Sequence, residues 1–119
     1  AYEQVCIHHI NQIKKALGIS GIASDVCSWT KKGENGAQID LIIDRSDRVI
    51  DLCEIKYCDR PFEIKKDYAD WLKERRDIFR ENVRTNKTLH LTMITPFGLA
   101  KGKYESCVQG CVTAADLFQ

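Results

Sequence analysis

Two short stretches decide the fold: GAQIDLIID at residues 36–44 and LCEIK at residues 52–56. They belong to two apolar runs, residues 37–44 and 49–57, which are rich in isoleucine, leucine and valine and are separated by the polar sequence RSDR. A polar linker this short favours an antiparallel hairpin. The sequence therefore predicts a β-hairpin near the middle of the chain.

The flanking segments predict an α/β domain around this hairpin. Apolar residues at helical spacing predict a helix over residues 2–17 and a long amphipathic helix from Pro61 to Val83. Alternating patterns predict strands over residues 22–31 and 87–95 and a short strand near residues 104–109. Residues 112–118 predict a short strand followed by a helical turn. No linker divides residues 1–119, so we expect one domain.

Composition narrows the class of protein. The 18 lysines and arginines nearly balance 17 acidic residues, giving a net charge of +1, so any binding of nucleic acid must depend on a local patch. No apolar run approaches the roughly 20 residues of a membrane-spanning helix, and no signal-peptide pattern is present, so we expect a cytoplasmic chain with no membrane partner. The first residues already read as a helix without a cap, which predicts a fragment of a longer protein.

Six cysteines allow a different reading, a redox or zinc-binding domain. No CxxC pair is present to complete a tetrahedral zinc site, and Cys107-x3-Cys111 is only a weak match to zinc-ligand spacing. Cys6, Cys27 and Cys53 lie among apolar neighbours in the sequence, where a free thiol acts as a small hydrophobic side chain. We expect all six cysteines to be structural.

Three charged residues are predicted to share one face of the hairpin. Strand residues two apart point the same way, so Glu54 and Lys56 emerge side by side. A turn centred near residues 46–47 brings Asp40 opposite residues 52–54. Two carboxylates this close repel each other unless a cation lies between them. Mg²⁺ or Mn²⁺ suits Asp40 and Glu54, with the backbone carbonyl of Ile55 as a further oxygen donor, and the implied chemistry is metal-assisted hydrolysis of a phosphodiester.

The same stretches resemble motifs II and III of the PD-(D/E)XK nuclease superfamily. The whole chain more closely resembles the C-terminal PD-(D/E)XK domain attached to AAA-type ATPases of bacteria and archaea, through residues 9–18, 28–29, 36–56, 61–72 and 116–118. The resemblance implies a restriction-endonuclease-like core, a mixed sheet flanked by helices, and a catalytic triad of Asp40, Glu54 and Lys56. It also implies that Glu3 can add to the metal site. Ile39 replaces the proline that precedes the aspartate in the nominal motif.

DNA is therefore the expected substrate, and an ATPase domain in the full-length chain the expected partner. Candidate nucleic-acid contacts are Lys65, Lys66 and Tyr68 at the start of the long helix, and Lys73 and Arg76 on a basic stripe that also reads as an ordinary solvated face. Neither a Walker A nor a GxGxxG pattern occurs, so ATP is not expected to bind here. The competing reading is a non-catalytic module that binds DNA or docks on the ATPase.

Overall fold

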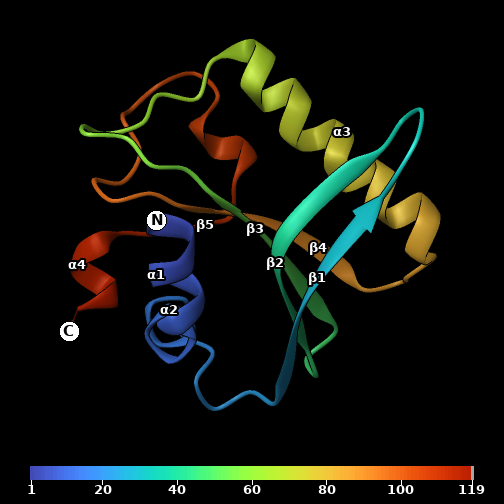
Figure 1. Cartoon of the computed structure of the whole chain (residues 1–119), viewed down its shortest axis with the longest axis horizontal. Helices are drawn as coiled ribbons and strands as arrows, with labels where there is room; N and C mark the ends of the chain where they lie inside the picture. The colour runs from blue at the N-terminus through green and yellow to red at the C-terminus, as the bar shows by residue number, and fades with distance from the viewer. Residues whose placement is uncertain (119) are drawn as a thin grey trace.

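The computed structural model describes residues 1–118 and has a five-stranded mixed sheet with helices on both faces (Figure 1). The strands are β1 (Ser24–Lys31), β2 (Ala37–Arg45), β3 (Val49–Ile55), β4 (Thr88–Ile94) and β5 (Gly110–Val112), and they lie in that order across the sheet. β1, β2 and β3 are antiparallel neighbours, whereas β3, β4 and β5 run parallel. The predicted α/β class is confirmed, and the arrangement is compatible with a restriction-endonuclease-like core.

The two faces of the sheet carry separate apolar clusters. α3 (Lys66–Val83) covers one face, where Leu72 and Phe79 pack on Ile50 and Leu52. α1 (Tyr2–His8), α2 (Ile10–Ala16) and α4 (Ala114–Leu117) belong to the other face, whose cluster includes Ile43 and other side chains of β2, β3 and β4. Alternate residues of β3 serve alternate clusters, as the pleat of a strand requires.

The central hairpin has the predicted antiparallel register. Leu41 pairs with Cys53, and Asp44 pairs with Ile50. The turn between the strands closes with Arg48 at a positive φ of 68°. Continuing the register one step beyond Leu41 and Cys53 sets Asp40 opposite Glu54.

β2 contains an irregularity beside β1. Cys27 pairs with Ile42, but Trp29 pairs with Ile39, so one residue of β1 spans two residues of β2, Asp40 and Leu41. Such a bulge resets the alternation of side chains along the strand. Ile39 and Ile42 therefore both join the α3 cluster, although they are three residues apart.

Three local predictions were wrong. The first helix breaks at His9, whose φ of −116° and ψ of 35° are not helical. The long helix begins at Lys66 rather than at Pro61, because the backbone of Phe62 is committed to hydrogen bonds with Gly98 and Ala100. Residues 104–109 form no strand and instead contain the 3₁₀ turn η1 (Glu105–Cys107).

Candidate functional site

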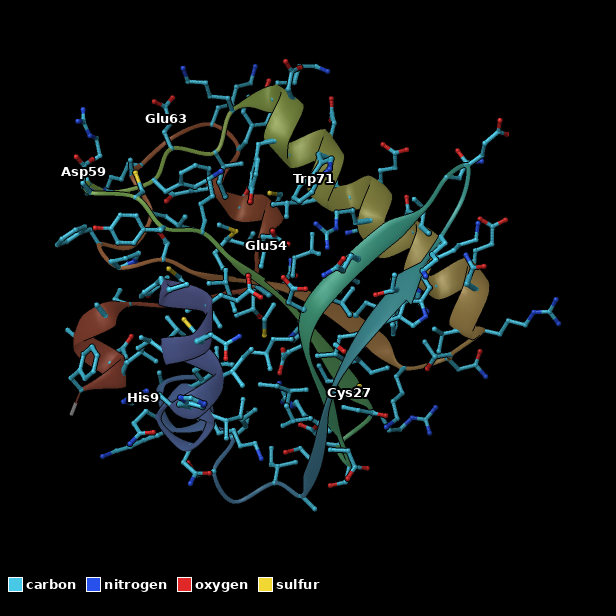
Figure 2. The ribbon with its side chains drawn as sticks, in the orientation of Figure 1. His9, Cys27, Glu54, Asp59, Glu63 and Trp71 are labelled. Atoms are coloured by element: carbon cyan, nitrogen blue, oxygen red, sulfur yellow. The ribbon has the colours of Figure 1, made fainter. Side chains whose placement is uncertain are left out.

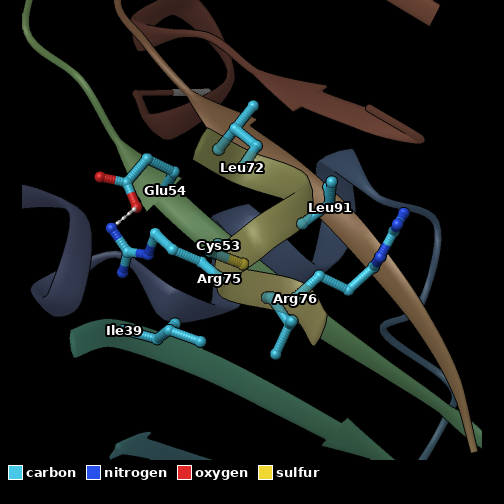
Figure 3. A pocket seen from close by; sticks show the side chains of 8 residues that line it. Ile39, Cys53, Glu54, Leu72, Arg75, Arg76 and Leu91 are labelled. Atoms are coloured by element: carbon cyan, nitrogen blue, oxygen red, sulfur yellow. Dashed lines mark ion pairs between the residues drawn. The ribbon is translucent and has the colours of Figure 1, made fainter. Parts of the chain in front are cut away.

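Glu54 lies at the end of β3 where it faces α3. Its carboxylate oxygen is 3.2 Å from Nη1 of Arg75, a residue of α3, and both side chains are largely buried, with exposed fractions of 25% and 14% (Figure 3). Together with Leu72, Leu91 and other apolar side chains they line a cavity of about 10 Å³. A space of that size holds about one water molecule. The position of Glu54 is therefore fixed by the apolar side chains around this cavity and by its ion pair with Arg75.

Asp40 enters the site from β2. Its Oδ1 accepts a hydrogen bond of 2.6 Å from Nε2 of Gln38, and the residue is half-buried. The charge of Asp40 acts on Glu54, because it is one of the causes that raise the pKa of the Glu54 carboxyl. The two carboxylates are thus brought together as the hairpin register predicts.

Lys56 follows the last residue of β3 and is exposed. Its backbone N–H donates to the carbonyl of Ile94 at 2.9 Å, which continues the pairing with the β4 side of the sheet. Its ammonium lies 5.8 Å from the ring centroid of Phe62 and 5.9 Å from that of Tyr68, so two aromatic faces hold it. The positive charge of Lys56 also lowers the pKa of Glu54, so the two side chains lie near each other, as their spacing of two along one strand predicts.

An open cleft of about 780 Å³ lies against these residues. Figure 2 shows Glu54 in the middle of the molecule, with Trp71 on α3 and Glu63 on the segment before it. The lining combines the end of β3, the loop before α3 and the first turns of α3: Glu54, Ile55, Lys56, Phe62, Glu63, Lys65, Asp67, Tyr68 and Trp71. Glu54 and Lys56 therefore face a space that is large enough for part of a ligand.

Burial dominates the electrostatics of Glu54. Loss of water around the carboxylate raises its pKa, the Arg75 guanidinium lowers it, and the Asp40 carboxylate raises it again. The net effect is a pKa above the ordinary value of 4.5. The folded chain thus binds this proton more tightly than the unfolded chain, so the stability gained from protonation is complete below about pH 4.5 and is lost as the pH rises through the raised pKa.

We expect a carbon-detected NMR titration of the Glu54 side-chain carboxyl to show this raised pKa. Arg75→Met should raise it further because the neighbouring positive charge is lost, and Asp40→Asn should lower it because a negative charge is lost. Arg84→Met removes an arginine beyond the end of α3 and should leave the titration unchanged. Shifts of Arg75→Met and Asp40→Asn in the same direction would contradict this account of the site.

The other predicted site residues divide into two groups. Lys65 and Tyr68 line the cleft with Glu54, as predicted, and Glu3 on α1 is close enough for its charge to raise the pKa of Glu54. Lys66 lies outside that lining and forms an exposed ion pair with Asp70 at 2.8 Å. Lys65 can therefore contact a ligand in the cleft, whereas Lys66 lies outside it.

The basic stripe of α3 is mostly engaged elsewhere. Arg76 is half-buried beside the small cavity under Glu54 and pairs with Asp77 at 3.4 Å, while Lys73 is exposed. Arg80 donates to the carbonyls of Thr85 and Lys87 and so fixes the turn after α3. The structure does not gather this stripe into the cleft.

A divalent ion fits the donor set at Glu54 only with help from oxygen atoms outside the side chains. Within residues 1–118, no three His, Cys, Asp or Glu side chains gather closely enough to hold a metal. Asp40 and Glu54 supply two carboxylates that interact unfavourably with each other. Magnesium commonly takes one or two carboxylates and completes its shell with carbonyl, water and phosphate oxygens, so the residues present fit such an ion.

The cysteines are free thiols. Cys6 and Cys53 are buried in the cluster beneath α1 and α2, as predicted, and burial raises the pKa of Cys6 to about 11. The prediction for Cys27 was wrong, because it is exposed on β1, the first strand of the sheet. Apolar neighbours in sequence do not bury a residue on an edge strand, which lacks a neighbour on one side.

Sequence reasoning missed Arg75 as a site residue. Arg75 follows Leu72 by three residues and so lies on the apolar side of the long helix, where an arginine is out of place unless it has a buried partner. Its guanidinium carbon also lies 4.3 Å from the ring centroid of Trp71. A charged residue within an apolar stripe, opposite a strand that bears a glutamate, was the signal available for this ion pair.

Comparison with known proteins adds a likeness of fold. No protein-family model matches the chain, and no curated protein matches it. Its structure is similar to the crystal structure of AF1548, described as a protein of unknown function, with a TM-score of 0.58 and 19% sequence identity. The match covers 93% of this chain and 56% of AF1548, so the chain spans a little over half the length of that protein. At 19% identity the likeness extends to the fold alone.

In residues 1–118 no helix is long and apolar enough to cross a bilayer.

Proposed function

We propose that this chain is a metal-dependent nuclease domain that hydrolyses phosphodiester bonds of DNA. The observation that carries the proposal is the shared cleft: the carboxylate of Glu54 and the ammonium of Lys56 line one open space, and the charge of Asp40 acts on Glu54 from the adjacent strand. Two carboxylates that can hold a divalent ion, with an ammonium beside them, suit metal-assisted hydrolysis of a phosphodiester.

Each of the three side chains has a distinct role in this proposal. Asp40 and Glu54, with the backbone carbonyl of Ile55, would hold Mg²⁺ or Mn²⁺, while Glu3, which forms no three-residue metal cluster with them among the described residues, acts on Glu54 through its charge. When bound, the ion supplies charge that lowers the pKa of a water molecule and polarises a phosphoryl oxygen. Lys56 donates to a phosphate oxygen and stabilises the negative charge that develops there. The aromatic rings of Phe62 and Tyr68 keep that ammonium at the mouth of the cleft.

Arg75 neutralises Glu54 while no ion is bound. Because a buried carboxylate without a partner is costly, the guanidinium stabilises the site in the metal-free chain. An incoming cation competes with this arginine for the same carboxylate. We therefore expect metal binding to be weak until substrate phosphate adds its own oxygen ligands.

Substrate contacts in the proposal lie along the cleft. Lys65 and Tyr68 are placed to bind the DNA backbone near Glu54, whereas Lys66, Lys73 and Arg76 would contribute at longer range. The proposal extends to an ATPase domain in a longer chain and to a cytoplasmic location, both on the resemblance and composition of the sequence.

The test is cleavage of supercoiled plasmid and of branched DNA by the purified chain with Mg²⁺ or Mn²⁺. We expect nicked or linear product with either ion and none in EDTA. Saturating Mn²⁺ should also raise the melting temperature, since a ligand at 100 times its dissociation constant stabilises the folded state by about 2.7 kcal/mol. An intact substrate together with an unchanged melting temperature would contradict the proposal.

One observation favours a second function, a silent module that docks on an ATPase or binds DNA without cutting it. The Glu54–Arg75 ion pair already satisfies the buried carboxylate without a metal. In that case the chain would shift the mobility of DNA in EDTA and show neither cleavage nor a response to Mn²⁺. The same two assays therefore separate the two functions.

A further inference from the structure

β1 forms an open edge of the sheet. It runs for eight residues, Ser24–Lys31, and within residues 1–118 it pairs only with β2. The opposite edge, β5, has three residues. Natural proteins blunt long edges with proline, bulges or inward-pointing charges. The interior of β1, Val26 to Thr30, has none of these, because the extra residue of the bulge belongs to β2.

We propose that β1 pairs with β1 of a second copy of this chain, in antiparallel orientation around a two-fold axis at Ser28, so that two sheets join into one. An isologous interface of this kind requires a strand that is complementary to itself. A net charge of +1 leaves little repulsion between the two copies.

The charges of β1 meet this requirement. With Ser28 opposite Ser28, the residue numbers of each facing pair add to 56, so Asp25 of each copy lies opposite Lys31 of the other. Among the residues that the structure describes, neither side chain takes part in an ion pair within the chain. Opposite charges facing each other across antiparallel strands are stabilising, and the two-fold axis makes the pair twice.

Apolar side chains of β1 also lie at this interface. Val26 is 44% exposed and Cys27 is exposed, and as consecutive strand residues they leave apolar surface uncovered on opposite faces of the edge strand. Cys27 of one copy faces Trp29 of the other on the face of α3. There a hollow of about 170 Å³ is lined by Cys27, Phe79, Val83 and other side chains. Trp29 also lines this hollow, where its indole packs on Phe79 of its own chain with ring centroids 5.3 Å apart, so Cys27 of the second copy would lie beside that indole.

A cysteine at the axis gives the sharpest test of the register. In a Cys27→Ser background, Ser28→Cys places two thiols directly opposite each other, and cross-strand Cβ atoms about 4.5–5.5 Å apart are near disulfide range. We expect mild oxidation to give a covalent dimer, in which mass spectrometry identifies a disulfide between the two substituted positions. Thr30→Cys is the matched control, because it faces Val26 and should give little dimer. Equal cross-linking of both variants would overturn the register.

A charge reversal tests the interface without a covalent bond. Asp25→Lys and Lys31→Asp each place like charges opposite each other twice, and each should weaken self-association about five-fold in sedimentation equilibrium. The double variant restores opposite charges and should recover the association of the wild type. Wild-type protein that stays monomeric at several hundred micromolar would overturn the proposal. Neither experiment depends on DNA or metal, so the outcome is independent of the proposed nuclease activity.

Discussion

Replacing Lys56 with alanine is expected to lower the rate of DNA cleavage by about 100-fold or more. Removing one preorganised donor to a developing negative charge typically costs a factor of about 10²–10³ in kcat. The fold should be unaffected, because the side chain of Lys56 is exposed and lies outside both apolar clusters. Measuring nicking of supercoiled plasmid under single-turnover conditions, alongside the melting temperature, separates lost chemistry from lost stability.

Lys103→Ala is a matched control for this variant. Its ammonium lies 5.7 Å from the ring centroid of Tyr104, an environment like that of Lys56, but it is not part of the cleft lining. Asp40→Ala should lower the rate of DNA cleavage as Lys56→Ala does, because the two residues act in one site. Cleavage that is equal in wild type, Asp40→Ala and Lys56→Ala would end the catalytic assignment, and a loss in Lys103→Ala as large as in Lys56→Ala would point to bulk charge instead.

The largest effect on stability is expected from Asp51→Ala, on β3. Asp51 is 2% exposed, its Oδ2 is 3.1 Å from Nη1 of Arg45, and its Oδ1 is 3.7 Å from Nδ1 of His90. Asp51→Ala leaves the largely buried guanidinium of Arg45 with Asp47, which is partly exposed, as its remaining partner, and removing one partner of a buried ion pair typically costs about 3–5 kcal/mol. Urea unfolding followed by circular dichroism should show this loss as a lower midpoint with an unchanged slope.

Asp47→Ala tests the same arginine at its exposed side. Arg45 also binds Asp47, at 2.6 Å, but the carboxylate of Asp47 is 35% exposed, so water can replace it and a smaller loss is expected. Combining Asp51→Ala with Arg45→Met removes both buried charges and should recover part of the stability lost in Asp51→Ala alone. Equal losses in the two aspartate variants would show that burial does not control the strength of this cluster.

Local pattern was sufficient to predict the elements that build the site. The apolar runs on both sides of RSDR specified the hairpin, and their alternation fixed an antiparallel register that, continued by one step, sets Asp40 opposite Glu54. The apolar stripe from Leu72 to Phe79 specified the face of α3 that covers the sheet. Period and parity are properties of the chain itself, so a reader of the sequence can recover them without knowing the packing.

Tertiary partners decided what the sequence could not show. Arg75 pairs with Glu54 because α3 packs across the end of β3 that bears this glutamate. Phe62 leaves the helical pattern because two backbone hydrogen bonds join it to residues 98 and 100. The strand expected near residues 104–109 does not form, because pairing with β4 begins only at Gln109. The backbone N–H of Gln109 donates to the carbonyl of Leu91, and its side-chain oxygen accepts from the N–H of Leu91. Contacts between segments far apart in sequence leave no periodic signal within either segment.

The extra residue in β2 also gives this fold a measure of evolvability. Because the bulge lets Ile39 and Leu41 serve opposite cores, Asp40 between them is required by neither. Selection can therefore change this position for chemistry without disturbing the packing around it. Descendants of one ancestral scaffold could gain or lose the carboxylate while the same architecture persists.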